Sequence, residues 1–273
     1  MTAIAAAFDA ARADNRAALI GYLPAGFPSV EGAIAAIEAM IRGGVDIVEL
    51  GLPYSDPLID GPVIQSAVDQ ALRTGTTTAD VLETVRRIAA GGTATLVMTY
   101  WNPIERYGVA RFADDVAAAG GSGVIAPDLT PEEAGDWLSA GSAAGLDTVF
   151  LAAPSSTEAR LRLVAEAAGG FIYAASTMGV TGERAAVSSR AAELVARLRA
   201  VTDKRVAVGL GVSSGAQAAE IAQFADGVIV GSAFVRCLLD AATPDAGIRA
   251  VEAFARELAE GVRARTVADV TQR

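Results

Sequence analysis

The sequence predicts a single-domain α/β barrel of eight parallel strands. Eight short apolar segments alternate with amphipathic helical segments along the chain. Such alternation is typical of a parallel sheet, and eight units favour its closure into a barrel. The 273 residues, 52% of them hydrophobic, suit one large core and contain no linker or break in composition. An open doubly wound sheet is the structural alternative, but no Gly-x-Gly-x-x-Gly follows an early strand.

Each element of this (β/α)8 TIM barrel follows from hydrophobic periodicity and from the residues that start and stop helices. The Ala-rich stretch at 2–15 has high helix propensity, so the barrel carries an extra N-terminal helix. Strands are expected at 17–22, 47–51, 94–100, 123–126, 147–152, 171–175, 205–210 and 227–230. Helices are expected after Ser29, at 62–74, 80–90, 109–119, 131–144 and 158–168, and around Leu194 and Leu198. Loops are expected at 101–103 and 177–188, the second long enough to be a lid.

The composition excludes several classes of protein. A net charge of −10 without a basic cluster argues against nucleic-acid binding. No apolar run approaches the length of a membrane span, and the N-terminus lacks the pattern of a signal peptide, which predicts a cytoplasmic protein. The single Cys237 forbids an internal disulfide, and its apolar neighbours favour a packed thiol over a nucleophile.

Two absences restrict the chemistry further. The chain has no histidine, which removes every Ser-His-Asp and Cys-His mechanism. Its only lysine, Lys204, precedes a predicted strand, whereas barrel active sites lie after the strands. We therefore expect Lys204 on the opposite face, where it cannot form a Schiff base with a substrate. Carbon–carbon chemistry in this chain would depend on carboxylates.

Two carboxylates flank one loop after the second strand. Glu49 lies near the end of a buried strand, where burying a charge is costly. Because side chains alternate along a strand, Ile47, Glu49 and Gly51 share one face, which we expect to be the barrel interior. Asp60 follows on a Pro-rich loop, shortly before Pro62 begins a helix. The alternatives are a structural carboxylate held by backbone amides for Glu49 and an ordinary helix cap for Asp60.

Glycine-rich turns end the last two predicted strands. Gly211 follows the seventh strand, and Gly231 with Ser232 follows the eighth. In barrels of this type these loops commonly hold a phosphate, because backbone N–H groups and the helix dipole favour an anion. Tight turns without a ligand are the alternative for either loop alone, but the two together favour phosphate. Tyr173, third in the sixth strand, fits the core or the wall of a ligand site equally well.

One segment carries a specific family resemblance. It runs from Glu49 to Gln65 and reads Glu-Leu-Gly-Leu-Pro-Tyr-Ser-Asp-Pro-Leu-Ile-Asp-Gly-Pro-Val-Ile-Gln. This segment strongly resembles the signature of the tryptophan synthase alpha-subunit family. The resemblance continues in order along nearly the whole chain, in Tyr100-Trp-Asn-Pro-Ile, Pro127-Asp-Leu-Thr-Pro-Glu-Glu, Gly179-Val-Thr-Gly, Gly209-Leu-Gly-Val-Ser and Gly231-Ser232.

The resemblance implies a lyase of tryptophan biosynthesis. The family cleaves indole-3-glycerol phosphate to indole and glyceraldehyde 3-phosphate. It works as a heterotetramer with a beta subunit, which carries pyridoxal phosphate and receives the indole, so the resemblance implies no cofactor in this chain. By matching motif, Glu49 would be the general acid/base, and Asp60 would accept a hydrogen bond from the indole N–H.

Matching motifs also imply the remaining site residues. The indole and glycerol site would be lined by Tyr22, Ile64, Met98, Ile125, Tyr173 and Leu210, with Thr181 on the lid. Phosphate donors would be Gly182, Gly211, Gly231 and Ser232. Three positions depart from the usual family pattern: Phe27 stands for a frequent Asp, Tyr54 for a frequent Phe and Met98 for a frequent Leu. The first two affect loop detail or partner contacts, and the third affects packing around the indole.

The residues support this chemistry independently of the resemblance. Retro-aldol cleavage needs a group that takes the glycerol hydroxyl proton, a group that protonates the indole ring and a charge that stabilises the cationic ring. A buried carboxylate with a raised pKa can move both protons, and a second, ionised carboxylate can stabilise the ring. Two rival functions remain open. One is another phosphate-binding barrel of the same pathway, such as an isomerase or indole-glycerol-phosphate synthase, and the other is a non-catalytic barrel that activates a partner.

Overall fold

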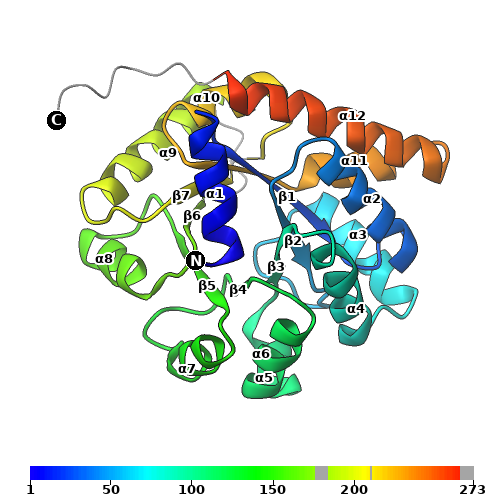
Figure 1. Ribbon diagram of the computed structural model, residues 1–273, viewed down its shortest axis with the longest axis horizontal. Coiled ribbons are helices and arrows are strands. Elements are labelled where there is room, and N and C mark those ends of the chain that lie inside the picture. The colour runs from blue at the N-terminus through cyan, green and yellow to red at the C-terminus, as the bar shows by residue number, and fades with distance from the viewer. Residues whose placement is uncertain (176–183, 210, 265–273) are drawn as a thin grey trace.

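The structure of the chain, a computed structural model, describes residues 1–175, 184–209 and 211–264, of which 184–187 are described by their backbone alone. Within these ranges eight parallel strands form a closed barrel surrounded by helices (Figure 1). The strands are β1 (Ala18–Pro24), β2 (Ile47–Gly51), β3 (Ala94–Met98), β4 (Gly123–Ile125), β5 (Asp147–Ala152), β6 (Ile172–Ala175), β7 (Val206–Gly209) and β8 (Gly227–Val230). Each strand pairs with the next, and β1 pairs with β8, which confirms the predicted (β/α)8 fold.

Twelve helices surround or close this barrel in the described ranges. They are α1 (Ala3–Ala13), α2 (Val30–Arg42), α3 (Pro62–Arg73), α4 (Thr78–Ala89), α5 (Trp101–Tyr107), α6 (Val109–Ala118), α7 (Gly135–Ala143), α8 (Glu158–Ala167), α9 (Arg184–Arg199), α10 (Gly215–Ala222), α11 (Ser232–Leu239) and α12 (Pro244–Arg263). None of them is long and apolar enough to cross a membrane.

The alternation of side chains along the strands divides the core into two layers. On β2, Ile47 belongs to the cluster inside the barrel, whereas Val48 and Leu50 pack in the layer between strands and helices. Glu49 is 1% exposed between these outward-facing neighbours. The predicted orientation of β2 is therefore correct, and Glu49 occupies the interior face.

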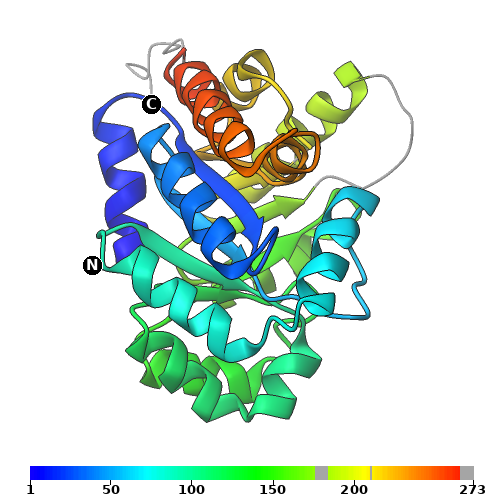
Figure 2. The same cartoon turned by 90° about the vertical axis from the view of Figure 1, so that its right-hand side faces the viewer.

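The extra helix α1 closes one end of the barrel. Its Ile4 and Phe8 belong to the same inner cluster as residues of the strands, and the Phe8 ring centroid lies 5.5 Å from that of Phe171. In Figure 1 α1 crosses the front of the barrel, and in Figure 2 it lies at the left end with α3 at the right. Phe171 directly precedes β6, and Phe8 also lies beside Gly227, the first residue of β8, so α1 covers the N-terminal ends of the strands and leaves the C-terminal ends for the functional loops.

The structure corrects the predicted loop at 101–103. These residues form the first turn of helix α5, and Pro103 is tolerated there because the first turn needs no N–H donor. The carboxylate of Asp128 accepts hydrogen bonds from the backbone N of Trp101 at 2.9 and 3.1 Å. A side chain from the loop after β4 thus caps this helix, and no local pattern could reveal that.

Three other helix starts also differ from prediction. Helix α7 begins at Gly135, because Thr130 and Glu133 form a separate turn in which the Thr130 hydroxyl donates to the Glu133 carboxylate at 3.0 Å. Helix α4 begins two residues before the predicted start, because Thr77 forms its capping box. The predicted loop at 177–188 ends earlier, since α9 begins at Arg184 in a stretch rich in good helix formers.

Candidate active site

The two predicted catalytic carboxylates act on the same neighbouring side chain. Burial raises the pKa of Tyr22 well above its usual range, and the charges of Asp60 and then Glu49 raise it further. Burial followed by the charge of Glu49 has the same effect on the pKa of Tyr173. Glu49, Asp60 and these two tyrosines therefore form one cluster at the barrel interior.

Glu49 is a buried acid without full hydrogen-bond satisfaction. Its Oε2 atom is buried and has no hydrogen-bond partner among the described residues. Burial, with a smaller contribution from the charge of Asp60, raises the pKa of Glu49 to about 8. Such a group is protonated near neutral pH and can both donate and accept a proton there. The alternative of a carboxylate held by backbone amides does not account for this unpartnered oxygen.

Asp60 does not cap helix α3. The N-cap residue is Gly61, with no side-chain cap hydrogen bond, and Pro62 occupies the first turn. The alternative role of Asp60 as an ordinary helix cap is therefore wrong. Asp60 is half-buried on the loop that connects β2 to α3. Burial raises its pKa, and a hydrogen bond from Tyr100 opposes that rise.

Two glycines make room for the tyrosine rings of this cluster. A Cβ on Gly51 would lie 2.4 Å from the Tyr22 hydroxyl, and a Cβ on Gly209 would lie 2.4 Å from the Tyr173 hydroxyl. Both separations are shorter than real side chains tolerate, so each tyrosine ring packs directly against the backbone of a glycine at the end of a strand. The rings consequently occupy the barrel mouth and can form walls of a ligand site.

The other predicted wall residues that the structure describes lie in the same region. Met98 and Ile125 continue the register from Gly51 across β3 and β4, and both contact the inner cluster. Ile64 is 9% exposed on α3, one turn after Asp60. Leu210 and Thr181 lie outside the described residues.

The loops after β7 and β8 present features of an anion site. Gly231 is the N-cap of α11, and its carbonyl accepts from Phe234 N at 2.9 Å and Val235 N at 3.3 Å. The backbone N–H groups of Ser232 and the next residue come before the first N–H groups that form helical hydrogen bonds. They can therefore donate to an anion at the helix N-terminus. A Cβ on Gly231 would lie 3.2 Å from the Tyr22 ring, which brings this terminus beside the carboxylate cluster.

Gly211, the other described phosphate candidate, has a backbone that favours glycine. Its φ is +67°, and an added Cβ would meet no atom of the residues that the structure describes within 4 Å. The side of the turn that a Cβ would occupy is therefore open, and the turn itself requires the left-handed conformation. Gly182, the third glycine of the predicted site, lies outside the described residues.

Comparison with known proteins identifies the family. The family model described as tryptophan synthase alpha chain matches residues 8–263. This chain belongs to that family. The tryptophan synthase alpha chain of Acidothermus cellulolyticus is 59% identical over 263 residues, which cover 96% of this chain and 98% of that protein. The alpha chain of Thermobifida fusca is 57% identical over 97% of this chain and 99% of its own length.

Solved structures agree with the family assignment. A chain from a ligand-free crystal structure of Mycobacterium tuberculosis tryptophan synthase is 51% identical and superposes with a TM-score of 0.89. The match covers 96% of this chain and all of that chain. The tryptophan synthase alpha chain of Legionella pneumophila superposes with a TM-score of 0.87 at 30% identity, over 96% of this chain and 97% of its own.

The structure places all three residues that depart from the usual tryptophan synthase alpha-chain pattern. Phe27 is 1% exposed and packs in the outer core. The Tyr54 hydroxyl accepts a hydrogen bond from Asn102 Nδ2 at 2.8 Å, a contact that the more frequent Phe could not make. Met98 is half-buried in the inner cluster.

Tyr100 belongs to the site although no sequence pattern marked it individually. Its hydroxyl accepts a hydrogen bond from Ile59 N at 3.2 Å and bonds to Asp60, and burial is the main reason why its pKa rises to about 12. The available signal was its position just after β3, inside a motif shared with the family.

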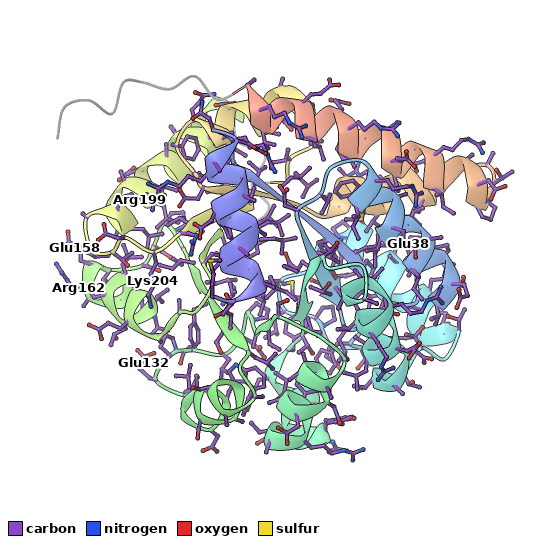
Figure 3. The ribbon with its side chains drawn as sticks, viewed as in Figure 1. Glu38, Glu132, Glu158, Arg162, Arg199 and Lys204 are labelled. Atoms are coloured by element: carbon purple, nitrogen blue, oxygen red, sulfur yellow. The ribbon has the colours of Figure 1, made fainter. Side chains whose placement is uncertain are left out.

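Lys204 and Cys237 lie away from this cluster. Lys204 Nζ donates to Ala168 O at 2.6 Å and Glu166 O at 3.2 Å, at the C-terminal end of α8 and before β7 begins. Figure 3 shows Lys204 beside α8, which confirms its predicted place at the face opposite the functional loops. Cys237 is half-buried against the outer core, and burial raises the pKa of its thiol.

Proposed function

We propose that this chain catalyses the retro-aldol cleavage of indole-3-glycerol phosphate to indole and glyceraldehyde 3-phosphate, as an alpha subunit in tryptophan biosynthesis. The observation that carries the proposal is the buried Glu49, whose Oε2 has no hydrogen-bond partner in the described part of the chain and whose pKa is about 8, next to a second carboxylate on a catalytic-face loop. Membership of the tryptophan synthase alpha-chain family supports the same reaction.

In the proposed reaction Glu49 moves two protons in sequence. Protonated Glu49 first donates its proton to ring carbon C3 of the indole, which makes the ring cationic. The ionised Asp60 carboxylate accepts the indole N–H hydrogen bond and stabilises that charge. The Glu49 carboxylate then takes the proton of the glycerol hydroxyl next to the ring. The carbon–carbon bond breaks, its electrons return to the ring as indole, and the hydroxyl carbon becomes the aldehyde of glyceraldehyde 3-phosphate.

The remaining predicted residues would bind the substrate around these carboxylates. The indole and glycerol portions would contact Tyr22, Ile64, Met98, Ile125, Tyr173 and Leu210, with Thr181 on the lid. The phosphate would accept hydrogen bonds from Gly182, Gly211, Gly231 and Ser232. The left-handed turn at Gly211 and the helix N-terminus that follows Gly231 support the phosphate part.

We further propose a partnership with a tryptophan synthase beta subunit in a cytoplasmic heterotetramer of two alpha and two beta subunits. Pyridoxal phosphate would belong to the beta subunit, and this chain would hold no cofactor. Leu58 supports a partner surface, because this large apolar side chain is 73% exposed on the loop between Glu49 and Asp60. A partner resting there would also restrict the movement of Asp60.

The decisive experiment is a direct assay of the products. Purified chain is incubated with indole-3-glycerol phosphate, with and without a beta subunit, and free indole is measured. We expect indole in both cases, and Glu49→Gln should reduce its formation by about 10²–10⁴-fold. An isomerase or an indole-glycerol-phosphate synthase would release no indole, and a non-catalytic barrel would show the same result with the wild type as with Glu49→Gln.

A further inference from the structure

Hydrogen bonds connect three consecutive loops at the catalytic face. They join the loop after β2, which carries Asp60, to the segment after β3, which carries Tyr100, and this segment to the loop after β4, which carries Asp128. We propose that Tyr100 is a positioning residue that holds Asp60 in its catalytic place, and that Asp128 fixes Tyr100 through the first turn of α5. This inference rests on the proposed function of Asp60.

The Tyr100 hydroxyl has the right hydrogen-bonding capacity for this task. A phenol offers one proton and can accept on its oxygen lone pairs. The oxygen accepts from Ile59 N at 3.2 Å, which leaves the proton available for the carboxylate of Asp60. One hydroxyl therefore holds the residue before Asp60 and also acts on the pKa of Asp60. Tyr100 is only 5% exposed, so its ring has little freedom to move away.

Asp128 holds the backbone to which Tyr100 is attached. Its two carboxylate oxygens accept from Trp101 N at 2.9 and 3.1 Å, and Trp101 is the first residue of α5. A negative charge at a helix N-terminus is favourable, so this cap stabilises the start of α5 directly after Tyr100. Without it the peptide between Tyr100 and Trp101 would lose its anchor to the next loop.

The Tyr100 ring also packs against the ring of Tyr54. The Tyr54 ring centroid lies 5.5 Å from that of Tyr100, at an interplanar angle of 38°. The Tyr54 hydroxyl in turn accepts from Asn102 Nδ2 at 2.8 Å, so the β2 loop is tied to α5 at two points. The ring contact, the hydrogen bond from Asn102 to Tyr54 and the hydrogen bond from Ile59 to Tyr100 therefore all restrict the loop that carries Asp60.

The charges around Asp60 explain why the interaction with Tyr100 affects the ionisation of Asp60 as well as its position. In the described part of the chain its titratable neighbours are Glu49 on β2, Tyr22 on β1 and Tyr100 before α5. Of these, Tyr100 donates a hydrogen bond that lowers the pKa of Asp60 against the effect of burial. Tyr100 thus favours an ionised Asp60 beside a protonated Glu49, which is the pair of states that the proposed reaction uses.

The test is Tyr100→Phe, which removes one oxygen and keeps the ring. We expect kcat to fall by roughly 10- to 100-fold, as for the loss of a hydrogen bond to a charged group, with a smaller change in KM. Because the pKa of Asp60 rises in the variant, the acid limb of the kcat/KM profile should move to higher pH. Asp128→Ala should shift the profile in the same direction by a smaller amount.

Tyr107→Phe is the matched control. The Tyr107 hydroxyl also donates to a carboxylate, Asp115 Oδ2 at 2.7 Å, but it does so between α5 and α6, on the outside of the barrel. This variant should keep the wild-type kcat and pH profile. The melting temperature of each variant separates loss of fold from loss of positioning.

Titration of the Asp60 carboxyl carbon by NMR, without substrate, tests the interaction between Tyr100 and Asp60 independently of turnover. We expect Asp60 to titrate at higher pH in Tyr100→Phe than in the wild type. An unchanged Asp60 titration in Tyr100→Phe, with at most a lower melting temperature, would overturn the inference. A wild-type protein that releases no indole would instead overturn the proposed function, and the NMR comparison would still decide whether Tyr100 acts on Asp60.

Discussion

Replacing Glu49 by Gln should make the chain more stable than the wild type at alkaline pH. Glu49 is 1% exposed, and burial is the main cause that moves its pKa from an ordinary 4.5 to about 8. Since a tenfold change in proton affinity is worth about 1.4 kcal/mol, this change corresponds to about 5 kcal/mol of folding free energy. Gln has nearly the same shape and cannot ionise, so the variant does not lose this folding free energy when the pH rises.

The sign of the effect follows from the proton held by the folded chain. Below about pH 4.5 Glu49 is protonated in both the folded and the unfolded chain, so its contribution to the free energy of unfolding does not depend on pH there. Between pH 4.5 and about 8 only the folded chain keeps the proton, and wild-type stability falls by about 1.4 kcal/mol per pH unit. Above about pH 8 the folded chain also loses the proton, and the loss is complete.

Urea unfolding of both proteins from pH 5 to pH 9 measures this difference. The free energy of unfolding of Glu49→Gln minus that of the wild type should grow by about 4 kcal/mol over this range and level off above about pH 8. Glu38→Gln, at an exposed position on α2 (Figure 3), is the control and should show a nearly constant difference. A difference for Glu49→Gln that stays constant with pH would refute the argument, because Glu49 would then ionise freely in the folded chain.

Three further predictions concern the site and its scaffold. Asp60→Asn should lower turnover much more than substrate binding, because the lost charge matters most for the cationic ring; equal losses in kcat/KM and in affinity for a substrate analogue would contradict this. Gly231→Val should weaken glycerol-phosphate binding measured by calorimetry, because its side chain would crowd the helix N-terminus and the Tyr22 ring 3.2 Å away; unchanged affinity would place the phosphate elsewhere. Phe8→Ala should lower the free energy of unfolding by about 3–5 kcal/mol in urea titrations, and a loss below about 1 kcal/mol would mean that α1 does not close the barrel core.

Sequence periodicity determined the elements and their main orientation. The alternation of eight apolar segments with helical ones is a local pattern, and it predicted the closed barrel that the strand pairing confirms. Period-two alternation on β2 was enough to turn Glu49 inward, because neighbouring side chains on a strand must face opposite sides. The position of Lys204 before its strand likewise predicted the face on which it lies.

Only the tertiary structure decided how the loops at the catalytic face are held. Helix α5 begins where it does because Asp128, 27 residues later in the chain, caps Trp101, and Tyr100 reaches Ile59 across 41 residues. Asp60 lies close to the start of α3, yet Gly61 is the N-cap residue, which leaves the Asp60 carboxylate for Tyr100. The pKa of Glu49 also depends on burial by distant segments. Local patterns reflect covalent neighbours, whereas these contacts arise when barrel closure brings separate loops together.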